Sequence, residues 1–477
     1  MTTRPLILDV DGTLIRSDLT HELLLEGAKA DPLKVPGYAL LGLRSKSRLK
    51  DVLVRRVGDR IATDALPLEP RTVDLANEAV AQGRDVYLCS GSEQSLVERL
   101  SQSLDFVSGA FGTTPDYNLT SENKADFLRE RFPEGFDYVG NSSQDYAVWS
   151  AAQQGYAIRP PRGAHGHRTA SGRDVEILEP RARSIRPLLR AMRPHQWAKN
   201  GLIFLVPLLI LESLGLNDWA AVLLGFLCMS LLASGTYIIN DLSDLHADRR
   251  HPSKSRRPLA AGTLSVPAGL AAGFGLIGLA LATAAVALPG AFLSVMAAYL
   301  ALTLTYSFVL KSTALVDVLT LAFLFLVRVA AGAAIVSQPL SPWLISFVLT
   351  FFLSLSFIKR YTELVKLTSR GRERAEGRGY SATDAPLVLS LGMMATGMAL
   401  LSFDLYGVVS DIPALRTKTA VLVVGTLLTY WLMRLWLLAH RESLDDDPVL
   451  FAVKDPLSVA IGTVIAAVVV LERVYPL

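Results

Sequence analysis

The stretch YIINDLSDLHAD, residues 237–248, places three aspartates at the end of an apolar run that begins near residue 219. Asp241, Asp244 and Asp248 are spaced i, i+3 and i+7, so on a helix they fall on one face. Carboxylates at membrane depth are costly and usually functional. Three like charges on one face repel, which predicts a positive partner, and Mg²⁺ that also binds a diphosphate meets this need. The alternative is a polar helix end that reaches into water.

Long apolar runs surround this stretch from residue 201 onward. A helix needs about 20 residues to cross about 30 Å of hydrocarbon. Candidate spans are residues 201–216, 219–240, 265–287, 290–308, 314–337, 341–360, 385–409, 418–439 and 456–475. The first is the weakest, because it is short and contains Pro207. We therefore expect an all-α polytopic membrane domain of about nine helices over 184–477, joined by a linker at 161–183 to a soluble domain at 1–160.

The composition supports this division. The 477 residues include 51% hydrophobic residues, and the 47 Lys and Arg against 44 Asp and Glu give a net charge of only +3. That small charge argues against a nucleic-acid partner. Two cysteines, Cys89 and Cys228, exclude a disulfide scaffold and a multi-cysteine metal site.

The loop charges predict the orientation in the membrane. Basic residues gather in the joints 241–262 and 359–384, whereas the joints near 211–218, 288–290 and 337–342 hold no Lys or Arg. The joint 410–418 is an exception. Because no secretory signal opens the chain, we expect the soluble domain and the basic joints to share the cytoplasmic face.

The soluble domain begins with PLILDVDGT, residues 5–13. An apolar strand that ends at Asp9 and Asp11 places carboxylates at its carboxyl end, where open α/β sheets bind ligands. Further strands are expected at 86–92 and 137–140, ending near Ser90 and before the loop 141–145. Residues 14–80 carry helical patterns that suggest a small cap. The expected fold is α/β and Rossmann-like.

The order of aspartate pair, Ser90, Lys124 and acidic loop resembles the haloacid dehalogenase superfamily of phosphotransferases. The resemblance implies that Asp9 is the nucleophile and Asp11 the acid and base. Ser90 and Lys124 would hold the phosphoryl group. Mg²⁺ would be bound by Asp9, Asp11 through its carbonyl group, and Asp145. Asn141 stands where the family often has an acid, so a degenerate regulatory domain is the alternative to an active phosphatase.

The motif NDxxDxxxD at 240–248, followed by Lys254, Arg256, Arg257 and Gly262, resembles the UbiA prenyltransferase superfamily of intramembrane enzymes. Tyr306, Lys311 and Asp317 match a further motif of that superfamily. The resemblance covers roughly 185–477. It implies Mg²⁺ bound by Asp241, Asp244 and Asp248, so that Mg²⁺ is expected in both domains.

The second aspartate-rich motif of that superfamily is replaced here by KRYTEL, residues 359–364. Lys359 and Glu363 share a helix face, and cations suit a further phosphate better than a second metal site. Together with RPHQWAKN, residues 193–200, this segment resembles the branch of decaprenyl-phosphate phosphoribosyltransferases. Members transfer phosphoribose from phosphoribosyl pyrophosphate (PRPP) to a polyprenyl phosphate. The substrate-binding candidates in the membrane domain are Asn240, Lys254, Arg257, Tyr306, Lys311, Lys359, Arg360, Glu363 and Arg378.

Within this set, Lys359, Arg360 and Arg378 are candidates for the 5-phosphate of PRPP, and Lys254, Arg257 and Lys311 for the lipid phosphate. The fused soluble domain is then expected to dephosphorylate the lipid product. The resemblance implies a bacterial cytoplasmic membrane, with both sites on the cytoplasmic side. A homo-oligomer is left open. Rival readings are prenyl transfer to an aromatic or other small acceptor, and a lipid-binding or scaffolding protein with inactive sites.

Overall fold

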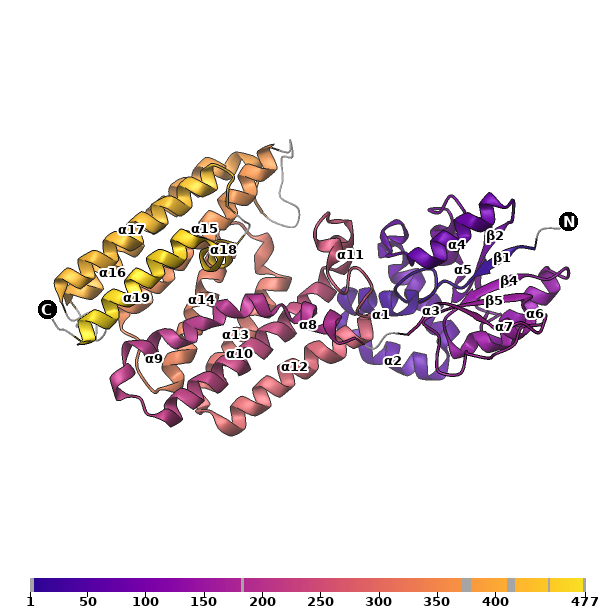
Figure 1. Ribbon diagram of the computed structural model, residues 1–477, viewed down its shortest axis with the longest axis horizontal. Helices are drawn as coiled ribbons and strands as arrows, with labels where there is room; N and C mark the ends of the chain where they lie inside the picture. The colour runs from indigo at the N-terminus through magenta and orange to yellow at the C-terminus, as the bar shows by residue number, and fades with distance from the viewer. Residues whose placement is uncertain (1–3, 182–183, 370–378, 410–416, 445–446, 475–477) are drawn as a thin grey trace. The chain divides into compact units, whose positions relative to one another are not determined.

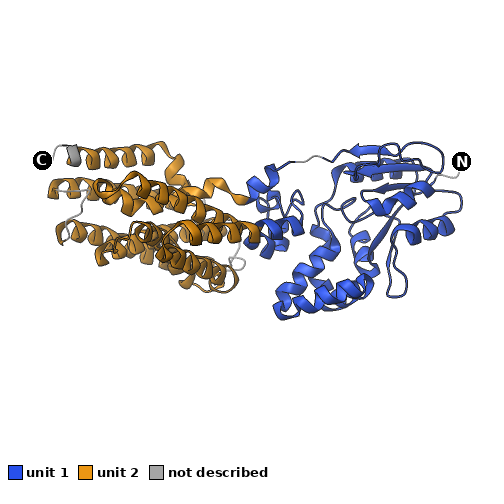
Figure 2. Cartoon of the chain, turned by 90° about the horizontal axis from the view of Figure 1, so that it is seen from below, with its two compact units in different colours: residues 1–191, 238–272 blue, residues 192–237, 273–477 orange. Residues whose placement is uncertain are grey.

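The structure of the protein is a computed structural model that describes residues 4–181, 184–369, 379–409, 417–444 and 447–474. The chain forms two compact units (Figure 2). The first comprises residues 1–191 together with 238–272, and the second comprises residues 192–237 and 273–477. The aspartate-rich stretch therefore belongs, by its contacts, to the same unit as the N-terminal domain.

The first unit contains one six-stranded parallel sheet (Figure 1). Its strands lie in the order β3-β2-β1-β4-β5-β6. They are β1 (Leu6–Leu8), β2 (Val86–Glu93), β3 (Gly109–Thr113), β4 (Asp137–Gly140), β5 (Gln154–Ile158) and β6 (Glu176–Glu179). The predicted parallel α/β sheet is confirmed. Because β1 and β4 are neighbours, the residues that follow them meet at one edge.

Helices cover both faces of this sheet. Leu6 and Leu8 of β1 pack into a core with α4 (Pro70–Ala81) and α5 (Gln94–Ser101). Ile7 points the other way, into a core with α6 (Ser121–Arg131) and α7 (Tyr146–Ala151). A strand buried on both faces is apolar throughout, which explains the unbroken run before Asp9.

Three helices lie between β1 and α4: α1 (Leu19–Ala30), α2 (Val35–Arg44) and α3 (Lys46–Val57). The Asp18 side chain caps α1 by accepting a hydrogen bond from the backbone N–H of His21 at 3.0 Å. Leu23 of α1 and Leu53 of α3 are buried in the same core as Leu6 and Leu8. This small helical layer therefore folds onto the sheet domain.

Helix α1 contacts α11 (Leu245–Arg250), which follows the end of α10 (Leu216–Ser243). Arg249 Nη2 donates to Glu22 Oε1 at 2.6 Å, and the two side chains are only 2% and 0% exposed. His246 Nε2 lies 3.2 Å from Glu26 Oε1. Together, two acids of α1 and two basic residues of α11 join these helices.

Seven helices in the described residues are long and apolar enough to span a membrane, and a pair bent by 80° raises this to eight. They are α10, α12 (Val266–Ala287), α13 (Gly290–Phe308), α14 (Val316–Ile335), α15 (Pro342–Ser369), α16 (Ala385–Val409) and α17 (Lys418–His440), with α18 (Pro448–Lys454) and α19 (Pro456–Val474) as the bent pair. The chain is thus a multi-pass membrane protein.

The predicted count of nine spans is not reached in these described residues. Instead of one helix, the candidate at 201–216 falls in three short segments: the end of η5 (Pro194–Phe204), α9 (Leu205–Leu209) and η6 (Leu211–Ser213). Pro207 lies in the middle of α9. Because proline lacks an N–H and its ring clashes with the preceding turn, it prevents a continuous helix at this position.

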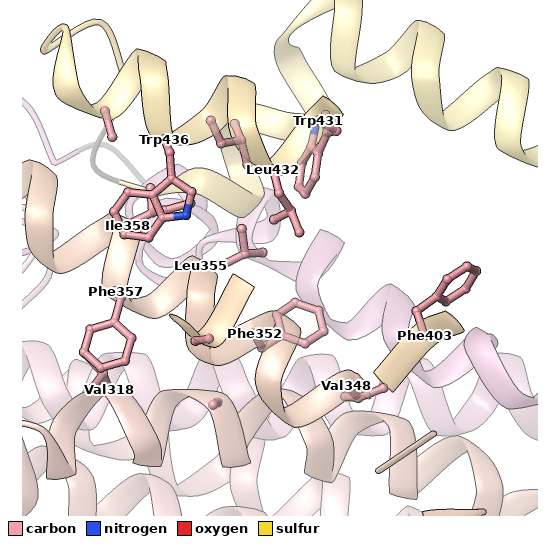
Figure 3. Packing of buried hydrophobic residues seen from close by; sticks show 14 of the residues in the cluster. Val318, Val348, Phe352, Leu355, Phe357, Ile358, Phe403, Trp431, Leu432 and Trp436 are labelled. Atoms are coloured by element: carbon pink, nitrogen blue, oxygen red, sulfur yellow. The ribbon is translucent and has the colours of Figure 1, made fainter. Parts of the chain in front are cut away.

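The core of the second unit is built from large apolar side chains of α15, α16 and α17. Figure 3 shows Phe352 and Leu355 of α15 near Trp431 and Leu432 of α17. The indole N–H of Trp431 donates to Ser458 Oγ at 2.9 Å. A buried tryptophan needs such a partner for its polar atom.

Small residues let backbones approach closely in this unit. A Cβ atom at Gly332 of α14 would lie 2.0 Å from the carbonyl oxygen of Ile203. The run of small residues 330–334 therefore permits tight packing, as small-residue stretches do in membrane helices.

Candidate functional site

At the carboxyl edge of the sheet, Asp9 is paired with Lys124 of α6. Lys124 Nζ donates to Asp9 Oδ1 at 2.8 Å, and Thr13 Oγ1 donates to Asp9 Oδ2 at 3.0 Å. Burial raises the pKa of Asp9 to about 7, although the Lys124 charge opposes the shift. The two residues that the sequence assigned to nucleophile and phosphate binding are thus brought together.

Asp11 faces the end of β2. Ser90 Oγ and Ser92 Oγ donate to Asp11 Oδ2 at 3.2 and 2.6 Å, and the Leu19 N–H donates to Oδ1 at 2.8 Å. Burial raises the pKa of Asp11 to about 6. The chain turns at Gly12, whose φ of +74° is a left-handed conformation that glycine adopts without strain. This turn lets Asp11 reach β2 from the end of β1.

Asp145, the third predicted metal ligand at this edge, accepts hydrogen bonds at both oxygens. Its Oδ2 accepts three hydrogen bonds, from Asn141 N at 3.0 Å, Ser142 N at 2.8 Å and Ser142 Oγ at 2.9 Å. Its Oδ1 accepts from Tyr138 Oη at 2.6 Å, and Tyr138 Oη in turn accepts from Lys124 Nζ at 3.1 Å. Both oxygens are therefore engaged in holding the loop 141–145 and, through Tyr138, Lys124.

In the described part of the chain, no group of three or more His, Cys, Asp or Glu side chains is arranged to hold a metal ion. The oxygen donors at the sheet edge are the carboxylates of Asp9 and Asp145, the carbonyl group of Asp11 and the amide of Asn141, and each oxygen of the two carboxylates already accepts a hydrogen bond. Asn141 lies against the turn, because a Cβ atom at Gly12 would be 2.1 Å from its Nδ2. Ligands that are all oxygen suit Mg²⁺, and the ion would displace some of these hydrogen bonds.

Three residues of this edge were not anticipated from the sequence. Glu69 is fully buried and accepts a bidentate pair from Arg16, at 2.9 and 3.1 Å, and a third bond from Arg159 at 2.7 Å. Arg159 Nη2 also lies 3.4 Å from the carbonyl oxygen of Gly12. In the sequence, these residues are indicated only by the position of Arg159 directly after an apolar strand.

A fourth unanticipated residue is Lys50 of α3, whose Nζ donates to the Gly91 carbonyl at 2.6 Å. Burial lowers the pKa of this ammonium group, while the nearby Asp11 charge opposes the shift. A lysine of the small helical layer is therefore held at the end of β2.

A cavity of about 590 Å³ opens beside this edge. Asp11, Gly12 and the loop 141–143 line one part of it, and Arg16 and Arg159 line another. The remaining wall includes Leu259, Leu264 and Val266, which follow the aspartate-rich stretch in the chain. The cavity thus joins residues from both segments of the first unit.

The aspartate-rich stretch forms a helix junction. Helix α10 ends at Ser243 and α11 begins at Leu245, with Asp244 at the break. Arg257 Nη1 donates to Asp241 Oδ1 at 3.0 Å and to Asp248 Oδ2 at 2.6 Å, so these two acids do share a side. Asn240 Nδ2 donates to Asp244 Oδ2 at 3.2 Å.

Arg257, which the sequence assigned to the lipid phosphate, is thus paired with two of the three acids. Asp241 and Asp248 are both buried, and burial raises the pKa of Asp248 while Arg257 opposes the shift. Carboxylates are ligands that suit Mg²⁺, but no three of them in the described residues are gathered around one point. To hold the ion, Arg257 would have to release its carboxylate oxygens and Asp244 would have to join Asp241 and Asp248.

Arg360, a predicted phosphate ligand, is held in an ion-pair network. Its guanidinium group is 0% exposed and bonds to Asp317 at 2.5 Å and to Glu363. Tyr380 donates to the other oxygen of Asp317 at 2.7 Å. Burial, and then its hydrogen bond to Asp317, raise the pKa of the Tyr380 hydroxyl. A phosphate would have to compete with two carboxylates for this guanidinium group.

The other predicted residues of the membrane half are spread over several elements. Tyr306 lies near the end of α13, Lys311 in η8 (Leu310–Ser312), Lys359 in α15, and Lys254 is exposed in η7 (Lys254–Arg256). Arg378 lies outside the described residues.

Arg328 of α14 is a buried cation that the sequence analysis passed over. Its Nε donates to Asn200 Oδ1 at 2.9 Å and its Nη2 to Tyr299 Oη at 2.9 Å. Asn200 belongs to the RPHQWAKN segment, and Trp197 of that segment donates to Ser234 Oγ at 3.0 Å. An arginine inside an apolar run was the signal, since such residues are rare and usually functional.

Comparison with known proteins places these features in context. Residues 201–455 match the UbiA prenyltransferase family. An uncharacterised protein of Sinorhizobium fredii is 37% identical over 98% of this chain and 90% of its own length. The nodulation protein NoeC of Azorhizobium caulinodans is 33% identical over 56% of this chain and 86% of its own length.

Decaprenyl-phosphate phosphoribosyltransferase of Mycobacterium tuberculosis is 36% identical over 198 residues, which are 39% of this chain and 63% of that enzyme. Among solved structures, a UbiA homologue from Archaeoglobus fulgidus bound to GPP and Mg²⁺ has a TM-score of 0.46 and 18% identity, covering 59% of this chain and 99% of that one. Because the family match covers more than half of the residues of this protein, the chain belongs to the UbiA prenyltransferase family.

Proposed function

We propose that the chain is a two-part enzyme of the cytoplasmic membrane. Its membrane half (184–477) transfers 5-phosphoribose from PRPP to a polyprenyl phosphate. Its N-terminal half (1–160), joined by the linker 161–183, removes the 5-phosphate from the lipid product. Both sites face the cytoplasm in this proposal, as the positive loops suggest.

The single observation that carries the transfer reaction is similarity to enzymes named decaprenyl-phosphate phosphoribosyltransferase. The buried acids of the helix junction support it, because a leaving diphosphate needs charge neutralisation. Bound Mg²⁺ supplies that neutralisation, and Asp241, Asp244 and Asp248 would hold it.

In the transfer step, a phosphate oxygen of the lipid attacks C1 of the ribose. The bond from C1 to the diphosphate oxygen breaks, and diphosphate leaves with the bonding electrons. Arg257, released from Asp241 and Asp248, is then available for a phosphate group of one substrate. Lys254, Lys311 and Lys359 remain candidates for the other phosphates.

The hydrolase reaction is supported by the position of Asp9 at the edge of the parallel sheet and by its contact with Lys124. An Asp9 oxygen attacks phosphorus while the ribose 5-oxygen leaves with a proton from Asp11. Water then cleaves the aspartyl phosphate and inorganic phosphate is released. Ser90 and Lys124 bind the phosphoryl oxygens, and Mg²⁺, which Asp9, Asp11 and Asp145 would hold, would supply further neutralisation.

The test is incubation of the purified full-length protein with PRPP, polyprenyl phosphate and Mg²⁺, followed by mass spectrometry of the lipid. The expected product is polyprenyl phosphoribose without its 5-phosphate. Asp9→Asn should leave the 5-phosphate in place, and Asp241→Asn should abolish the lipid product. Asp126→Asn and Asp218→Asn are matched controls, because Asp126 is exposed on α6 and Asp218 is exposed at the opposite end of α10 from Asp241.

The family also includes enzymes that transfer a prenyl chain, which is the reason for the second candidate. A labelled prenyl diphosphate with an aromatic or other small acceptor distinguishes the two. Incorporation of label into the acceptor, with PRPP unchanged, would replace the proposed donor. If neither donor is consumed, the result favours a lipid-binding or scaffolding protein with inactive sites.

A further inference from the structure

The cavity beside Asp11 is larger than a phosphate group requires. At about 590 Å³ it lies within the range of sites for whole small molecules. Asp11, Gly12 and Asn141 line it, and Asp11 is two residues along the chain from Asp9, the proposed nucleophile, which does not line it itself. A substrate whose phosphate lies beside Asp11 therefore has room to extend through the cavity.

Three arginines line the cavity as well. Arg16 and Arg159 share the carboxylate of Glu69, and Arg181 is the third. A second acid, Glu179, is 3.9 Å from Arg159 Nε, and Asp18 also lines the cavity. The acids are therefore at least as many as the arginines, and what the cavity offers an anion is the hydrogen-bond donors of the guanidinium groups.

Arg159 is held in a strained conformation at this place. Its φ is +46°, in the left-handed region that non-glycine residues rarely adopt. Such strain persists only where surrounding contacts enforce it, and it gathers at functional sites. Here the contacts are those of Nη2 with Glu69 and with the Gly12 carbonyl. The guanidinium is fixed next to the proposed catalytic turn.

Part of the lining is apolar. Leu259, Leu264 and Val266 line the cavity, and Val266 is the first residue of α12, a helix long enough to cross a membrane. A wall of this kind offers contact to hydrocarbon near the start of a membrane span. It is supplied by the segment that follows the aspartate-rich stretch, not by the sheet domain.

We propose that this cavity is the binding site for a lipid-linked sugar phosphate, with a subsite for its phosphodiester. The terminal phosphate lies at Asp9 and Asp11, the sugar spans the cavity, and Arg159 with Arg16 binds the diester anion. Leu259 and Leu264 contact the first carbons of the lipid. This inference rests on the proposed hydrolase function and deepens it, because it names what the hydrolase selects.

The experiment compares two substrates of the full-length protein in detergent. One is a short-chain prenyl phosphoryl ribose 5-phosphate, and the other is free ribose 5-phosphate. The measured quantity is the ratio of their kcat/KM values for phosphate release. We expect the lipid-linked substrate to be preferred by at least about tenfold, since a charged hydrogen bond contributes on that order.

Two variants locate the preference. Arg159→Gln should lower the ratio on the order of 10-fold to 100-fold. Leu264→Asp should also lower it, although Leu264 lies outside the sheet domain. Their controls are Arg168→Gln, at an arginine that does not line the cavity and whose side chain is 77% exposed, and Thr263→Asp, which places the same charge next to the cavity wall but not on it. A ratio near one, or a ratio that neither variant changes, overturns the subsite.

A binding measurement separates this inference from the hydrolase proposal. The probe is short-chain prenyl phosphoryl ribose without the 5-phosphate, titrated into the Asp9→Asn protein. Adding Arg159→Gln should weaken binding about tenfold, and unchanged binding overturns the subsite. If the wild-type protein releases phosphate from neither substrate, the hydrolase proposal fails, and the titration alone decides whether the cavity binds the diester.

Discussion

Gly262 and Arg16 approach each other so closely that no side chain fits between them. A Cβ atom at Gly262 would lie 2.1 Å from the Arg16 carbonyl oxygen, and the φ of Gly262 is +67°. Both the space and the backbone conformation therefore require glycine. This contact fixes the segment after the aspartate-rich stretch against the residue that shares Glu69 with Arg159.

Gly262→Ala should therefore destabilise the first unit. The methyl group must displace backbone and adopt a left-handed φ, which together cost on the order of 1 to 3 kcal/mol. The measurement is thermal unfolding of the full-length protein in detergent. Gly275→Ala is the matched control, because Gly275 on α12 has nothing within 4 Å of its Cβ position. Equal stability of Gly262→Ala and wild type would contradict the close contact.

Arg257→Gln should remove the cation that pairs with the two buried acids of the helix junction. Because Asp241 and Asp248 lose their shared cation, we expect a loss of about 3 kcal/mol in metal-free buffer. Mg²⁺ should restore more stability to this variant than to wild type, since ion and guanidinium bind the same oxygens. The readout is the melting temperature with EDTA and with Mg²⁺.

Arg256→Gln serves as the control for that experiment, because Arg256 is adjacent and exposed. If Mg²⁺ shifts the melting temperature of Arg257→Gln no more than that of wild type, competition between ion and arginine is excluded.

Glu69 predicts a defined pH dependence of stability. Burial alone would raise its pKa, but hydrogen bonds from Arg16 and the Arg159 charge lower it below the ordinary value of 4.5. A depressed folded pKa contributes stability above the unfolded pKa and loses it as the pH falls through the folded value. Glu69→Gln should thus be less stable than wild type by about 2 kcal/mol near pH 7.

The difference in the free energy of unfolding between wild type and Glu69→Gln should become smaller as the pH falls below 4.5. Unfolding in detergent across pH 7 to pH 3 measures it. If this difference in the free energy of unfolding stays constant from pH 7 to pH 3, the carboxylate charge of Glu69 does not contribute to stability. Glu78→Gln, at a position not buried on α4, is the matched control.

A structural feature of this protein could be predicted from the sequence where it depends on residues that are close together in the chain. The strands before Asp9 and Asn141 follow from short apolar runs that stop at polar residues, and β1 and β4 end there, whereas β2 continues past Ser90 to Glu93. The Glu69 cluster has no local signal, because its bonds join residues that are 53 and 90 positions apart in the chain.

Ion pairs between distant positions of the chain are equally hard to predict. Arg360 pairs with Asp317, which is 43 positions away, and no local pattern indicates this contact. The spacing of Asp241 and Asp248 did predict that they share a side. Their contact with Arg257 could not be predicted, because Arg257 lies 16 and 9 positions further along the chain.

Asp145→Asn tests whether this acid positions the loop or binds metal. Its two oxygens accept from Tyr138 and from three donors of the loop, and an amide has only one oxygen to replace them. Either the hydrogen bond from Tyr138 or the hydrogen bonds from the loop must be lost. We therefore expect the rate of phosphate release to fall on the order of 100-fold and the free energy of unfolding to fall by about 2 kcal/mol. If Asp145 only positions the loop, the Mg²⁺ concentration for half-maximal rate stays unchanged. By contrast, Asn141→Asp should lower that concentration, since it adds a charge beside Gly12. A large rise in the Mg²⁺ requirement of Asp145→Asn would return Asp145 to the metal site.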